Sequence, residues 1–493
     1  MSGKTRGLGL RGRVPGWAGA AGLAVLLAGC AGDGPADLMA TTAPVSAPRV
    51  TGVERAAEQE HARLVQAFGG EYRSPATQAL LAETVARLVP ATERPDESYR
   101  VTILDSAIVN AFALPSGRLY VTRGLLALAN DTAEIAGVLA HEIAHVTLRH
   151  AAARTEREQR SALIGRVMAE LANNPSASAA VLSEARYDIA RFSRVQEIEA
   201  DQIGVRTLVA AGYDPYGAVR FLESLGRAGD LRVSAAGERQ AGGTDMLATH
   251  PSTPERVQAA IQAARRAAAP GIGAGDRNRY LTAIEGLTYG DNPVDGLVRG
   301  RRFLHARLGV TFEAPEGIAL ENTAQAVVGA SSDGNRRLLF DAVQPEPGQS
   351  LEALLTSTWS DPVETGSLRA TTINGLPAAV ATSRGRDWSF RLAAIRVGNT
   401  TFRLIIAFRT LNPEAERAFE GALASVRALS PEEASAVRPL RVRLVTAGDG
   451  DTAEMLAARM PYDERAVQRF LVLNGLTRAG PLTPGARYKI VAD

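Results

Sequence analysis

The sequence predicts a multidomain protein: a mainly helical region with a small sheet that has an edge strand, then an α+β sandwich, then a βααβ module. Between residues 53 and 290, apolar residues recur mainly at helical spacing. From about Leu297 they alternate in short runs that are typical of strands. In about the last fifty residues, strand and helix patterns follow the order βααβ. We therefore expect domains at 53–290, 297–432 and 440–493.

The first 29 residues are typical of a secretory signal peptide. Four basic residues precede a short apolar run that ends at Gly29 and is too short to cross a membrane comfortably. The basic residues are Lys4, Arg6, Arg11 and Arg13. Cys30 follows Leu-Ala-Gly, which resembles the bacterial lipobox, whose cysteine is acylated. We expect a signal peptide at 1–29, lipidation at Cys30, and a flexible tether of small residues and prolines at 30–52.

The expected cellular location follows from this N-terminal segment. A cysteine that carries several acyl chains anchors a protein firmly to a membrane. Ala31, rather than an aspartate, follows Cys30. In enteric-type sorting this favours the outer membrane over the inner one. We therefore expect a periplasmic protein that a lipid anchor holds to the membrane, more specifically to the outer membrane.

The composition limits the classes of function. The chain has 493 residues, and 45% of them are hydrophobic, which is enough for several cores. Its formal charge is +2, but four positive charges lie in the predicted signal peptide, so the remainder is near −2 and we expect no nucleic-acid partner. A single cysteine forms no disulfide within the chain, so apolar burial must stabilise the domains.

The run His141-Glu142-Ile143-Ala144-His145 is the most informative motif in the chain. Residues four positions apart on a helix differ by ~40° around its axis. Both imidazoles can therefore bind one metal ion, and Glu142 then lies beside the ion without binding it. A chance match is expected in roughly one such sequence in two hundred. The alternative is a helix with two buried histidines and no metal.

The helix that carries this motif is predicted to run from Asp131 to Ala153. Asp131 and Glu134 are spaced as a capping-box pair, and an apolar stripe follows them. The stripe is formed by Ile135, Val138, Leu139, Ile143 and Val146. His150 lies ~180° from His141 around such a helix. We therefore expect His150 on the far face and not among the metal ligands.

The third metal ligand must come from elsewhere in the chain. A metzincin would have a histidine at position 151 and a glycine at position 148, where this chain has Ala151 and Leu148. That subclass is excluded. A second helix is predicted from about Ser183 to Ala211, and it contains an acidic run from Glu197 to Asp201.

Two carboxylates of this acidic run share one helix face. Glu197 and Asp201 are four residues apart, which suits one carboxylate on the metal and a second that accepts the other N–H of a ligand histidine. We expect Glu197 to bind the metal and Asp201 to support it. The alternative is a solvated acidic face. Glu199 points ~200° away from Glu197 and would be a ligand only if the helix face were assigned wrongly.

Together with other motifs, these residues resemble the gluzincin metallopeptidases of the family that includes the CAAX prenyl proteases, HtpX and BepA, which is metallopeptidase family forty-eight. The resemblance covers roughly Val53 to Gly290. Its other motifs are Asn110 to Pro115 with Gly117, Val121 to Leu125, Gly204, and Thr249 to Ser252 with Arg256. The resemblance implies a zincin-type protease fold and one zinc ion per chain.

The resemblance also implies roles for individual residues. It implies that the zinc ligands are His141, His145 and Glu197. The general base would be Glu142, and the substrate-side residues would be His250 and Arg256. The last two are candidates to stabilise an oxyanion or to gate the site. Alternatively, His250 occupies the open metal position in a resting enzyme. The segment from Gly226 to Thr244 that precedes it is either a mobile plug or an ordinary surface loop.

A strand is predicted from Arg118 to Thr122, after the turn at Pro115 to Gly117. In the resembled family it would edge the cleft. An extended substrate could then add to this edge by main-chain hydrogen bonds, which suits unfolded protein segments. A core strand explains the alternating pattern equally well.

The region 297–432 is predicted to be a small α+β domain. Its expected strands lie near 308–313, 324–330, 337–343, 369–373, 376–382, 391–397 and 401–407, and its helices near 351–359 and 413–426. Phe312, Pro315, Gly317 and the run Asn374 to Pro377 faintly resemble the PsbP and Mog families. No catalytic cluster is visible in the sequence of this region, and His305 is expected at the surface. A binding or spacer role follows.

The region 440–493 resembles the LysM module, which binds glycans that contain N-acetylglucosamine, such as peptidoglycan. The pattern predicts strands at Val442 to Val445 and Arg487 to Val491, with two helices between them. Gly450 departs from the usual Gly-Asp-Thr spacing of the loop before the first helix. Glycan binding is the first interpretation, and a packing appendage with the same fold is the second.

The sequence as a whole predicts a zinc-dependent endopeptidase of the bacterial cell envelope. Its expected substrates are unfolded or misassembled envelope proteins, in quality control or maturation. The competing hypothesis is a periplasmic chaperone or assembly factor for outer-membrane proteins, with little or no proteolysis. A zinc hydrolase that acts on glycan-linked peptides is a third.

Overall fold

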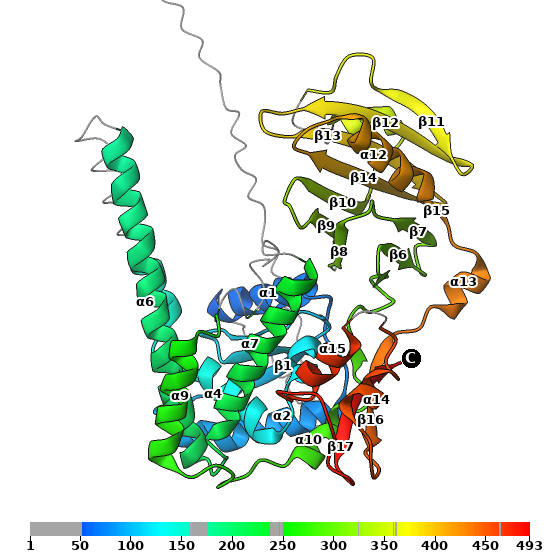
Figure 1. Cartoon of the computed structure of the whole chain (residues 1–493). Coiled ribbons are helices and arrows are strands. Elements are labelled where there is room, and N and C mark those ends of the chain that lie inside the picture. The colour runs from blue at the N-terminus through cyan, green and yellow to red at the C-terminus, as the bar shows by residue number, and fades with distance from the viewer. Residues whose placement is uncertain are drawn as a thin grey trace, which may run out of the picture. The chain divides into compact units, whose positions relative to one another are not determined.

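The computed structural model describes residues 52–157, 159, 175–236, 246, 250–323, 325–357, 359, 362–462 and 465–493. Residues 52–493 form one compact unit, which contains helices and several separate sheets (Figure 1). The prediction of helical and sheet-rich regions along the chain is confirmed at this level. The predicted signal peptide, Cys30 and nearly all of the predicted tether lie outside the described residues.

The first region begins with two helices and a three-stranded sheet. These are α1 (Gly52–Ala67), α2 (Pro75–Leu88), β1 (Arg100–Leu104), β2 (Ala111–Ala113) and β3 (Arg118–Thr122). The strand order is β1-β3-β2, with β1 parallel and β2 antiparallel to β3. The strand from Arg118 to Thr122 is therefore central in its sheet, which agrees with the core-strand alternative and not with an edge strand. Both sides of β3 are already hydrogen-bonded, which leaves β2 at one edge of this sheet.

Helices pack beside this sheet to complete the first region (Figure 1). They are α3 (Arg123–Leu128), α4 (Thr132–Thr147), α6 (Pro175–Ala210), α7 (Tyr216–Ala236), α9 (Pro254–Ala267) and α10 (Arg277–Ile284). Helix α4 contacts α6, α7 and β2. A Cβ atom on Gly217 of α7 would lie 2.4 Å from the backbone of Ala133. Only a glycine allows α7 to approach α4 so closely, so the backbone around α4 is tightly constrained.

Helix α4 is shorter than the sequence predicts. It ends at Thr147, with Leu148 as its C-cap, and Arg149 adopts a left-handed φ of 55°. The chain turns there and becomes helical again at His150. Because of this turn, the helical wheel drawn from Asp131 to Ala153 does not apply beyond Thr147. His150 does not lie on the far face of α4, and that prediction is wrong.

The middle region contains two sheets. The smaller is β15-β7-β6-β5, formed by Arg427–Ala428, Val310–Glu313, Arg302–His305 and Leu297–Arg299. The larger is β11-β12-β13-β14-β10-β9-β8, formed by Arg369–Ile373, Leu376–Arg384, Ser389–Val397, Thr400–Phe408, Arg336–Val343, Ala326–Ser331 and Ile318–Asn322. The predicted hairpin between 391–397 and 401–407 is present as β13 and β14. The sequence pattern did not reveal β5, β6 or β8.

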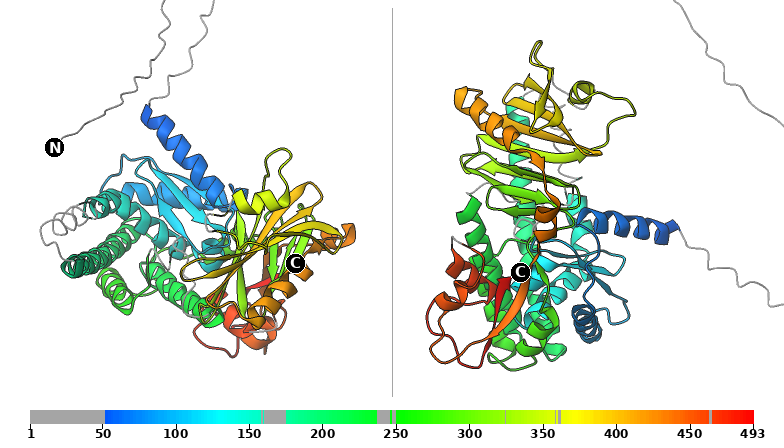
Figure 2. Two further views of the ribbon diagram at one scale, coloured as in Figure 1. Left: turned by 90° about the horizontal axis from the view of Figure 1, so that it is seen from above. Right: turned by 90° about the vertical axis from the view of Figure 1, so that its right-hand side faces the viewer.

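Both faces of the larger sheet are covered. Along β12, Ala378 and Val380 point into a core shared with α12 (Pro413–Ser425) and the smaller sheet. Ala379 and Ala381 alternate with them and point into a second core with α11 (Leu351–Ser357). Figure 2 shows these two helices on opposite sides of the sheet. This period-two alternation is what a strand buried on both faces requires.

His305 is buried in this region and not at the surface, where the sequence placed it. Its exposed fraction is 6%, and its ring lies edge-on to Phe303. Burial lowers the pKa of His305 to about 4. Its Nδ1 atom lies 3.4 Å from the backbone N–H of Leu308 and accepts a hydrogen bond from it. His305 is thus a neutral core histidine.

The C-terminal region shows the predicted order of elements. They are β16 (Leu440–Thr446), α14 (Ala453–Ala457), α15 (Ala466–Leu473) and β17 (Arg487–Ala492), and α13 (Pro431–Ala436) precedes them. Strands β16 and β17 are antiparallel, and β4 (Thr288–Tyr289) from the end of the first region pairs with β16. This sheet therefore joins the first and last regions by backbone hydrogen bonds.

A buried lysine strengthens this connection. Lys489 of β17 has an exposed fraction of 0%, and its Nζ lies 2.6 Å from the carbonyl of Ala127 and 2.7 Å from that of Ala129. It thus donates to carbonyls at the end of α3, which have no partner within the helix. Val442 of β16 belongs to the core of the first region. The C-terminal module is consequently packed against the helical region.

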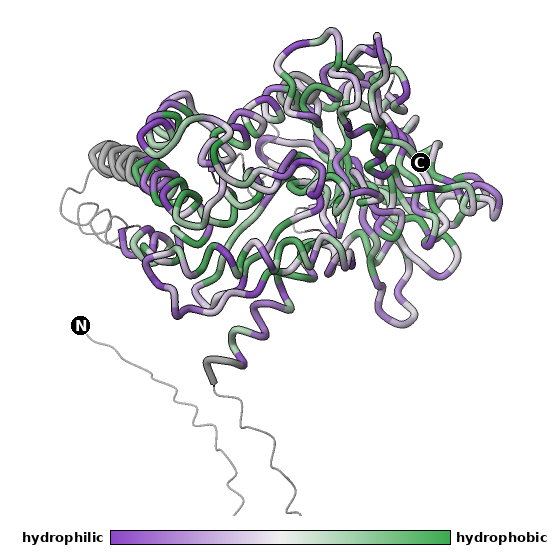
Figure 3. The backbone as a smooth tube through the Cα atoms, turned by 90° about the horizontal axis from the view of Figure 1, so that it is seen from below, coloured by the Kyte–Doolittle hydropathy of each residue, from purple (hydrophilic) through white to green (hydrophobic). Residues whose placement is uncertain are grey.

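Hydrophobic and hydrophilic stretches alternate along the described backbone (Figure 3). Among the helices that the structure describes, none combines the length and the apolar character that crossing a membrane requires.

Candidate metal centre

The N-terminus of α4 is fixed by a network of polar contacts. The Asp131 side chain accepts a hydrogen bond of 2.8 Å from the backbone of Glu134. The Glu134 carboxylate in turn accepts from the backbone of Asn130 at 2.8 Å, one residue before the position that a capping box uses. Arg220 of α7 bridges Asp131 and Asp214, at 2.8 and 2.7 Å. The helix is thereby held in position before its metal-binding turn begins.

Four side chains meet at the buried face of α4. His141 and His145 of α4, Glu197 of α6 and His250 each offer an atom, and these atoms all lie within 4.8 Å of one another. The Nε2 atoms of His141 and His145 are 3.0 Å apart. Glu197 Oε2 lies 2.8 Å from Nδ1 of His250 and 3.4 Å from Nε2 of His141. The helix spacing alone brings the first two together, and the α4–α6 packing adds the third.

Behind His141 lies a buried ion pair. Its Nδ1 atom is 2.9 Å from Oδ1 of Asp201, at an angle that is poor for a hydrogen bond. Arg256 holds both oxygens of this carboxylate, with Nε and Nη2 each donating at 2.8 Å. Its Nη1 also lies 3.1 Å from Oε2 of Glu197. Asp201 and Arg256 are only 6% and 3% exposed. The Arg256 guanidinium therefore faces the carboxylates of Asp201 and Glu197 in the protein interior.

Behind His145 lies a different group. Its Nδ1 atom is 2.9 Å from Nδ1 of His150. His150 Nε2 lies 3.5 Å from Oε2 of Glu199 on α6. His150 is 4% exposed, whereas the Glu199 side chain is 52% exposed and lies outside the group of four. The sequence analysis missed His150 as a site residue, because neither a glycine nor a proline signals the left-handed turn at Arg149.

Glu142 is buried next to this group. Its exposed fraction is 3%, and its Oε1 atom has no hydrogen-bond partner among the described residues. Burial raises its pKa, and the neighbouring His250 and His141 oppose that change. A carboxylate with a raised pKa and a free oxygen is suited to accept and return a proton.

The charges of the four converging residues depend strongly on one another. Burial alone would lower the pKa of His141, but the carboxylates of Asp201 and Glu197 raise it to about 10. Burial would raise the pKa of Glu197, but contacts with His141 and His250 hold it well below its usual range. Burial and the neighbouring His141 lower the pKa of His145 well below its usual value. His141 therefore binds a proton more tightly than His145 does.

The residues present fit a zinc ion. Three imidazole nitrogens and one carboxylate oxygen are ligands that zinc prefers. Within the described residues, Oε1 of Glu197 is buried without a hydrogen-bond partner, although it lies 3.5 Å from Nε2 of His145. Unpaired buried polar atoms are costly unless a further group satisfies them. A divalent cation among these four atoms would do so.

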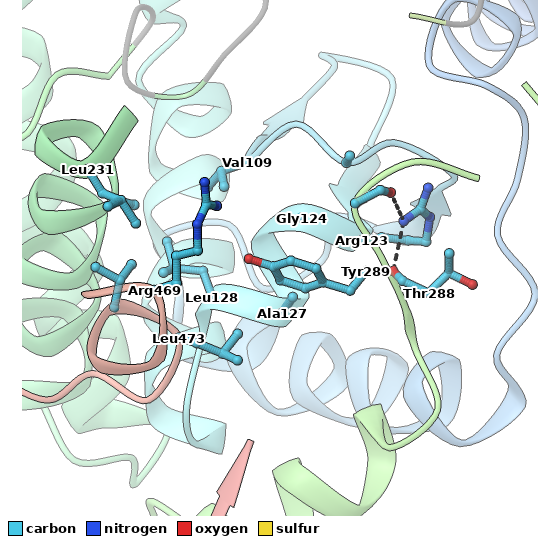
Figure 4. Close-up of a pocket in the computed structure, with 14 residues that line it drawn as sticks. Val109, Arg123, Gly124, Ala127, Leu128, Leu231, Thr288, Tyr289, Arg469 and Leu473 are labelled. Atoms are coloured by element: carbon cyan, nitrogen blue, oxygen red, sulfur yellow. Dashed lines mark hydrogen bonds between the residues drawn. The ribbon is translucent and has the colours of Figure 1, made fainter. Parts of the chain in front are cut away.

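A cavity elsewhere in the molecule contains none of these residues. Its volume is about 290 Å³, and it is bordered by α3, α7, β4 and α15. Figure 4 shows Tyr289 and Arg469 at this cavity, and Arg123 donating to the backbone behind Tyr289. Its lining is largely apolar. The metal-ligand geometry is thus found in the packed helices and not in this cavity.

Comparison with known proteins matches residues 75–264 to peptidase family M48. This part of the chain is therefore similar to the M48 peptidase domain. The matched residues run from α2 into α9 and include all four converging side chains, Glu142 and Asp201. The family resemblance seen in the sequence is confirmed, and so is the expectation of a zinc site in the M48 domain.

Curated relatives share the M48 domain with this chain. Mitochondrial metalloendopeptidase OMA1 of Arabidopsis thaliana is 37% identical, over 34% of this chain and 32% of the relative. The beta-barrel assembly-enhancing protease of Escherichia coli is 32% identical, over 28% of this chain and 30% of the relative. Human metalloendopeptidase OMA1 is 30% identical, over 33% and 31%. The chain thus spans about a third of the length of these relatives.

A solved structure resembles part of the chain weakly. The solution structure of PsbP from Synechocystis covers 28% of this chain and 98% of that protein, at 10% identity and a TM-score of 0.21. A score this low supports no conclusion about the fold of this chain.

Proposed function

We propose that this chain is a zinc-dependent endopeptidase of the bacterial cell envelope, which hydrolyses peptide bonds in unfolded or misassembled envelope proteins. The observation that carries the proposal is the convergence of His141, His145 and Glu197 next to buried Glu142. The match of residues 75–264 to peptidase family M48 supports the same reaction class. The names of its relatives, which are metalloendopeptidases and a beta-barrel assembly-enhancing protease, support protein substrates.

His141, His145 and Glu197 would hold the zinc ion. When bound, zinc supplies a Lewis acid that polarises a peptide carbonyl and makes a water molecule more acidic. Glu142 would take the proton from the attacking water and return it to the departing amine. Its burial raises its pKa toward the range that such transfers need.

The roles of His250 and Arg256 follow from their positions. His250 lies among the ligand atoms, at 2.8 Å from Glu197 and 3.4 Å from His141. This favours the hypothesis that it occupies the fourth position at rest and withdraws when a substrate binds. Arg256 is 3% exposed and pairs with Asp201. We therefore propose Arg256 as a support for the ligand carboxylates, in preference to an oxyanion donor.

The proposal is tested with the Glu142→Gln variant of the full chain. We expect its zinc content to remain at one ion per chain and its cleavage of a fluorescein-labelled unfolded protein to fall by ~10²-fold or more. Glu93→Gln, an exposed carboxylate of the same region, is the matched control and should retain full activity. Unchanged cleavage by Glu142→Gln, or wild-type protein without zinc after zinc loading, would refute the proposal.

A second candidate function is a chaperone or assembly factor for outer-membrane proteins. The name of the Escherichia coli relative, which combines assembly with proteolysis, favours it. Both candidates predict binding of unfolded clients, but only the peptidase needs Glu142 in the cell. If the Glu142→Gln variant restores growth to a deletion strain as fully as the wild type, the chaperone role is the main one.

The envelope location and the outer regions belong to the same proposal. Lipidation of Cys30 would hold the protein to the membrane, and a Cys30→Ser variant should fail to incorporate radiolabelled palmitate and should move to the soluble periplasmic fraction.

The C-terminal module would bind peptidoglycan. Sedimentation of the protein with purified peptidoglycan tests this, and absence of co-sedimentation would favour a packing role. The middle region, without an assigned role, would be a spacer or a binding surface.

A further inference from the structure

The two ligand imidazoles of α4 present the same ring atom to the metal cluster. Nε2 of His141 lies 3.0 Å from Nε2 of His145, and Nε2 of His145 lies 3.5 Å from Oε1 of Glu197. Each ring therefore has its Nδ1 atom on the side away from the cluster. A ligand imidazole must be neutral, so a ring that binds zinc through Nε2 carries its proton on Nδ1.

The Nδ1–H group of His145 needs an acceptor, because it lies in the protein interior. Ligand histidines usually donate this proton to a carboxylate, a backbone carbonyl or a water molecule. In this chain, Nδ1 of His150 lies 2.9 Å from Nδ1 of His145, with the two rings at 77°. His150 can accept only if its own proton is on Nε2.

The surroundings of His150 favour this tautomer. Its Nε2 atom lies 3.5 Å from Oε2 of Glu199, which is an acceptor. The ring is 4% exposed, and Gln196 of α6 donates to its backbone carbonyl at 3.2 Å. The left-handed turn at Arg149 brings the residue back toward α4. The position and burial of His150 are thus set by named contacts, and the nearby Glu199 carboxylate favours the tautomer with its proton on Nε2.

We propose that His150 is a positioning residue of the metal centre, which accepts the Nδ1–H of His145 while Glu199 holds its own proton on Nε2. This relay fixes the ring plane of His145 and directs Nε2 at the metal. It is the counterpart of Asp201 behind His141. The inference rests on the proposed zinc site, and it assigns a function to a residue outside the HExxH motif.

The experiment compares two variants of the full chain at His150. His150→Phe keeps a planar ring but removes the acceptor, whereas His150→Asn places a carbonyl oxygen near the position of Nδ1. We expect His150→Phe to weaken zinc binding by ~10- to 100-fold in chelator competition. His150→Asn should recover most of that loss, which a merely space-filling role would not predict. His305→Phe, a buried histidine of the middle region, is the matched control and should leave zinc affinity unchanged.

A second measurement reports on the ligand directly. In the cobalt-loaded protein, His150→Phe should shift the visible d–d absorption bands, and His150→Asn should return them toward the wild-type positions. If His150→Phe fails to fold, as shown by circular dichroism of the metal-free protein, Glu199→Ala replaces it, because Glu199 is largely exposed. That variant should weaken zinc binding by a few-fold.

The outcomes separate this inference from the proposed function. Wild-type protein that binds no zinc would overturn the zinc site itself. Wild-type protein that binds zinc while folded His150→Phe binds it equally well would overturn only the role of His150. Equal losses in His150→Phe and His150→Asn, with unchanged cobalt spectra, would also overturn it, since they indicate lost packing.

Discussion

The two metal-facing imidazoles of α4 are supported in different ways. Behind His141 lies a carboxylate that Arg256 holds by two hydrogen bonds, and both Asp201 and Arg256 are almost completely buried. Behind His145 lies a neutral imidazole that leads to the half-exposed carboxylate of Glu199. One support is charged and closed to water, and the other is neutral and ends at the surface.

The two supports differ in how strongly water screens their charges. Water screens Glu199 but not Asp201, so the interior pair contributes more to ordering the site than the outer one. The anions behind and beside His141 also raise its affinity for a proton, whereas His145 has lost that affinity. We therefore expect perturbations on the His141 side to have larger effects than perturbations on the His145 side.

The largest effect is expected for Asp201→Asn. This change removes the carboxylate that accepts two hydrogen bonds from buried Arg256, and breaking such a pair costs ~3–5 kcal/mol of unfolding free energy. Zinc affinity should fall by ~100-fold, the upper end for supporting residues. Urea unfolding of the metal-free protein and chelator competition measure the two quantities. Asp341→Asn, which removes the partner of Arg403 in the middle region, is the control and should not change zinc affinity. A normal affinity in Asp201→Asn would contradict the comparison.

Proton release upon zinc binding is the next prediction. Because the pKa of His141 is raised to about 10, this ring is protonated at pH 8 before zinc binds, while the lowered pKa of His145 leaves that ring neutral. Zinc must displace the proton, so its affinity should rise about tenfold for each pH unit between pH 7 and 9 and level off above about pH 10. Calorimetry in buffers of different ionisation enthalpy should give about one proton released per ion. Release of no proton at pH 8 would show that His141 is neutral before zinc binds, as His145 is.

Arg256→Lys tests the support behind His141 with a smaller change than Asp201→Asn. A lysine keeps the positive charge but cannot hold both oxygens of Asp201 in a fixed fork. We expect zinc affinity to fall by about 5- to 10-fold and the metal-free protein to be destabilised modestly. Arg279→Lys, whose partner Glu83 is exposed, should change neither quantity. An equal effect of both substitutions would mean that bidentate geometry is unimportant here.

The smallest effect is expected for Glu199→Gln. Its side chain is 52% exposed and lies 3.5 Å from His150, and the amide oxygen of glutamine can still accept the Nε2–H. Exposed pairs contribute little, so zinc affinity should fall by ~2- to 5-fold at most. A loss as large as that of Asp201→Asn would remove the distinction between the two sides.

The sequence predicted those parts of the site that depend on local spacing. His141 and His145 share one helix face, as do Glu197 and Asp201, because a four-residue separation fixes their relative direction. That these pairs face each other depends on the packing of α4 against α6, which the spacing within each helix does not fix. His150 was misplaced because Arg149 adopts a left-handed conformation that is rare for arginine and leaves no mark in the pattern.

The fold shows the same division between local and long-range information. Helices and hairpins of the middle region were predicted close to their observed bounds, since adjacent segments form them. The central place of β3 was not predicted, because its parallel partner β1 is separated from it by a crossover that alternation does not reveal. His305 was placed at the surface because polarity alone does not show that β6 packs against β7.

The contact of Lys489 has a consequence for the order in which the fold is completed. Its amino group lies within hydrogen-bonding distance of Ala127 and Ala129, residues 362 and 360 positions earlier in the chain. The ribosome adds Lys489 long after it has added α3. Until β17 is in place, the carbonyls of Ala127 and Ala129 must bind water or another donor. The end of α3 therefore reaches its final hydrogen bonding only when nearly the whole polypeptide is available.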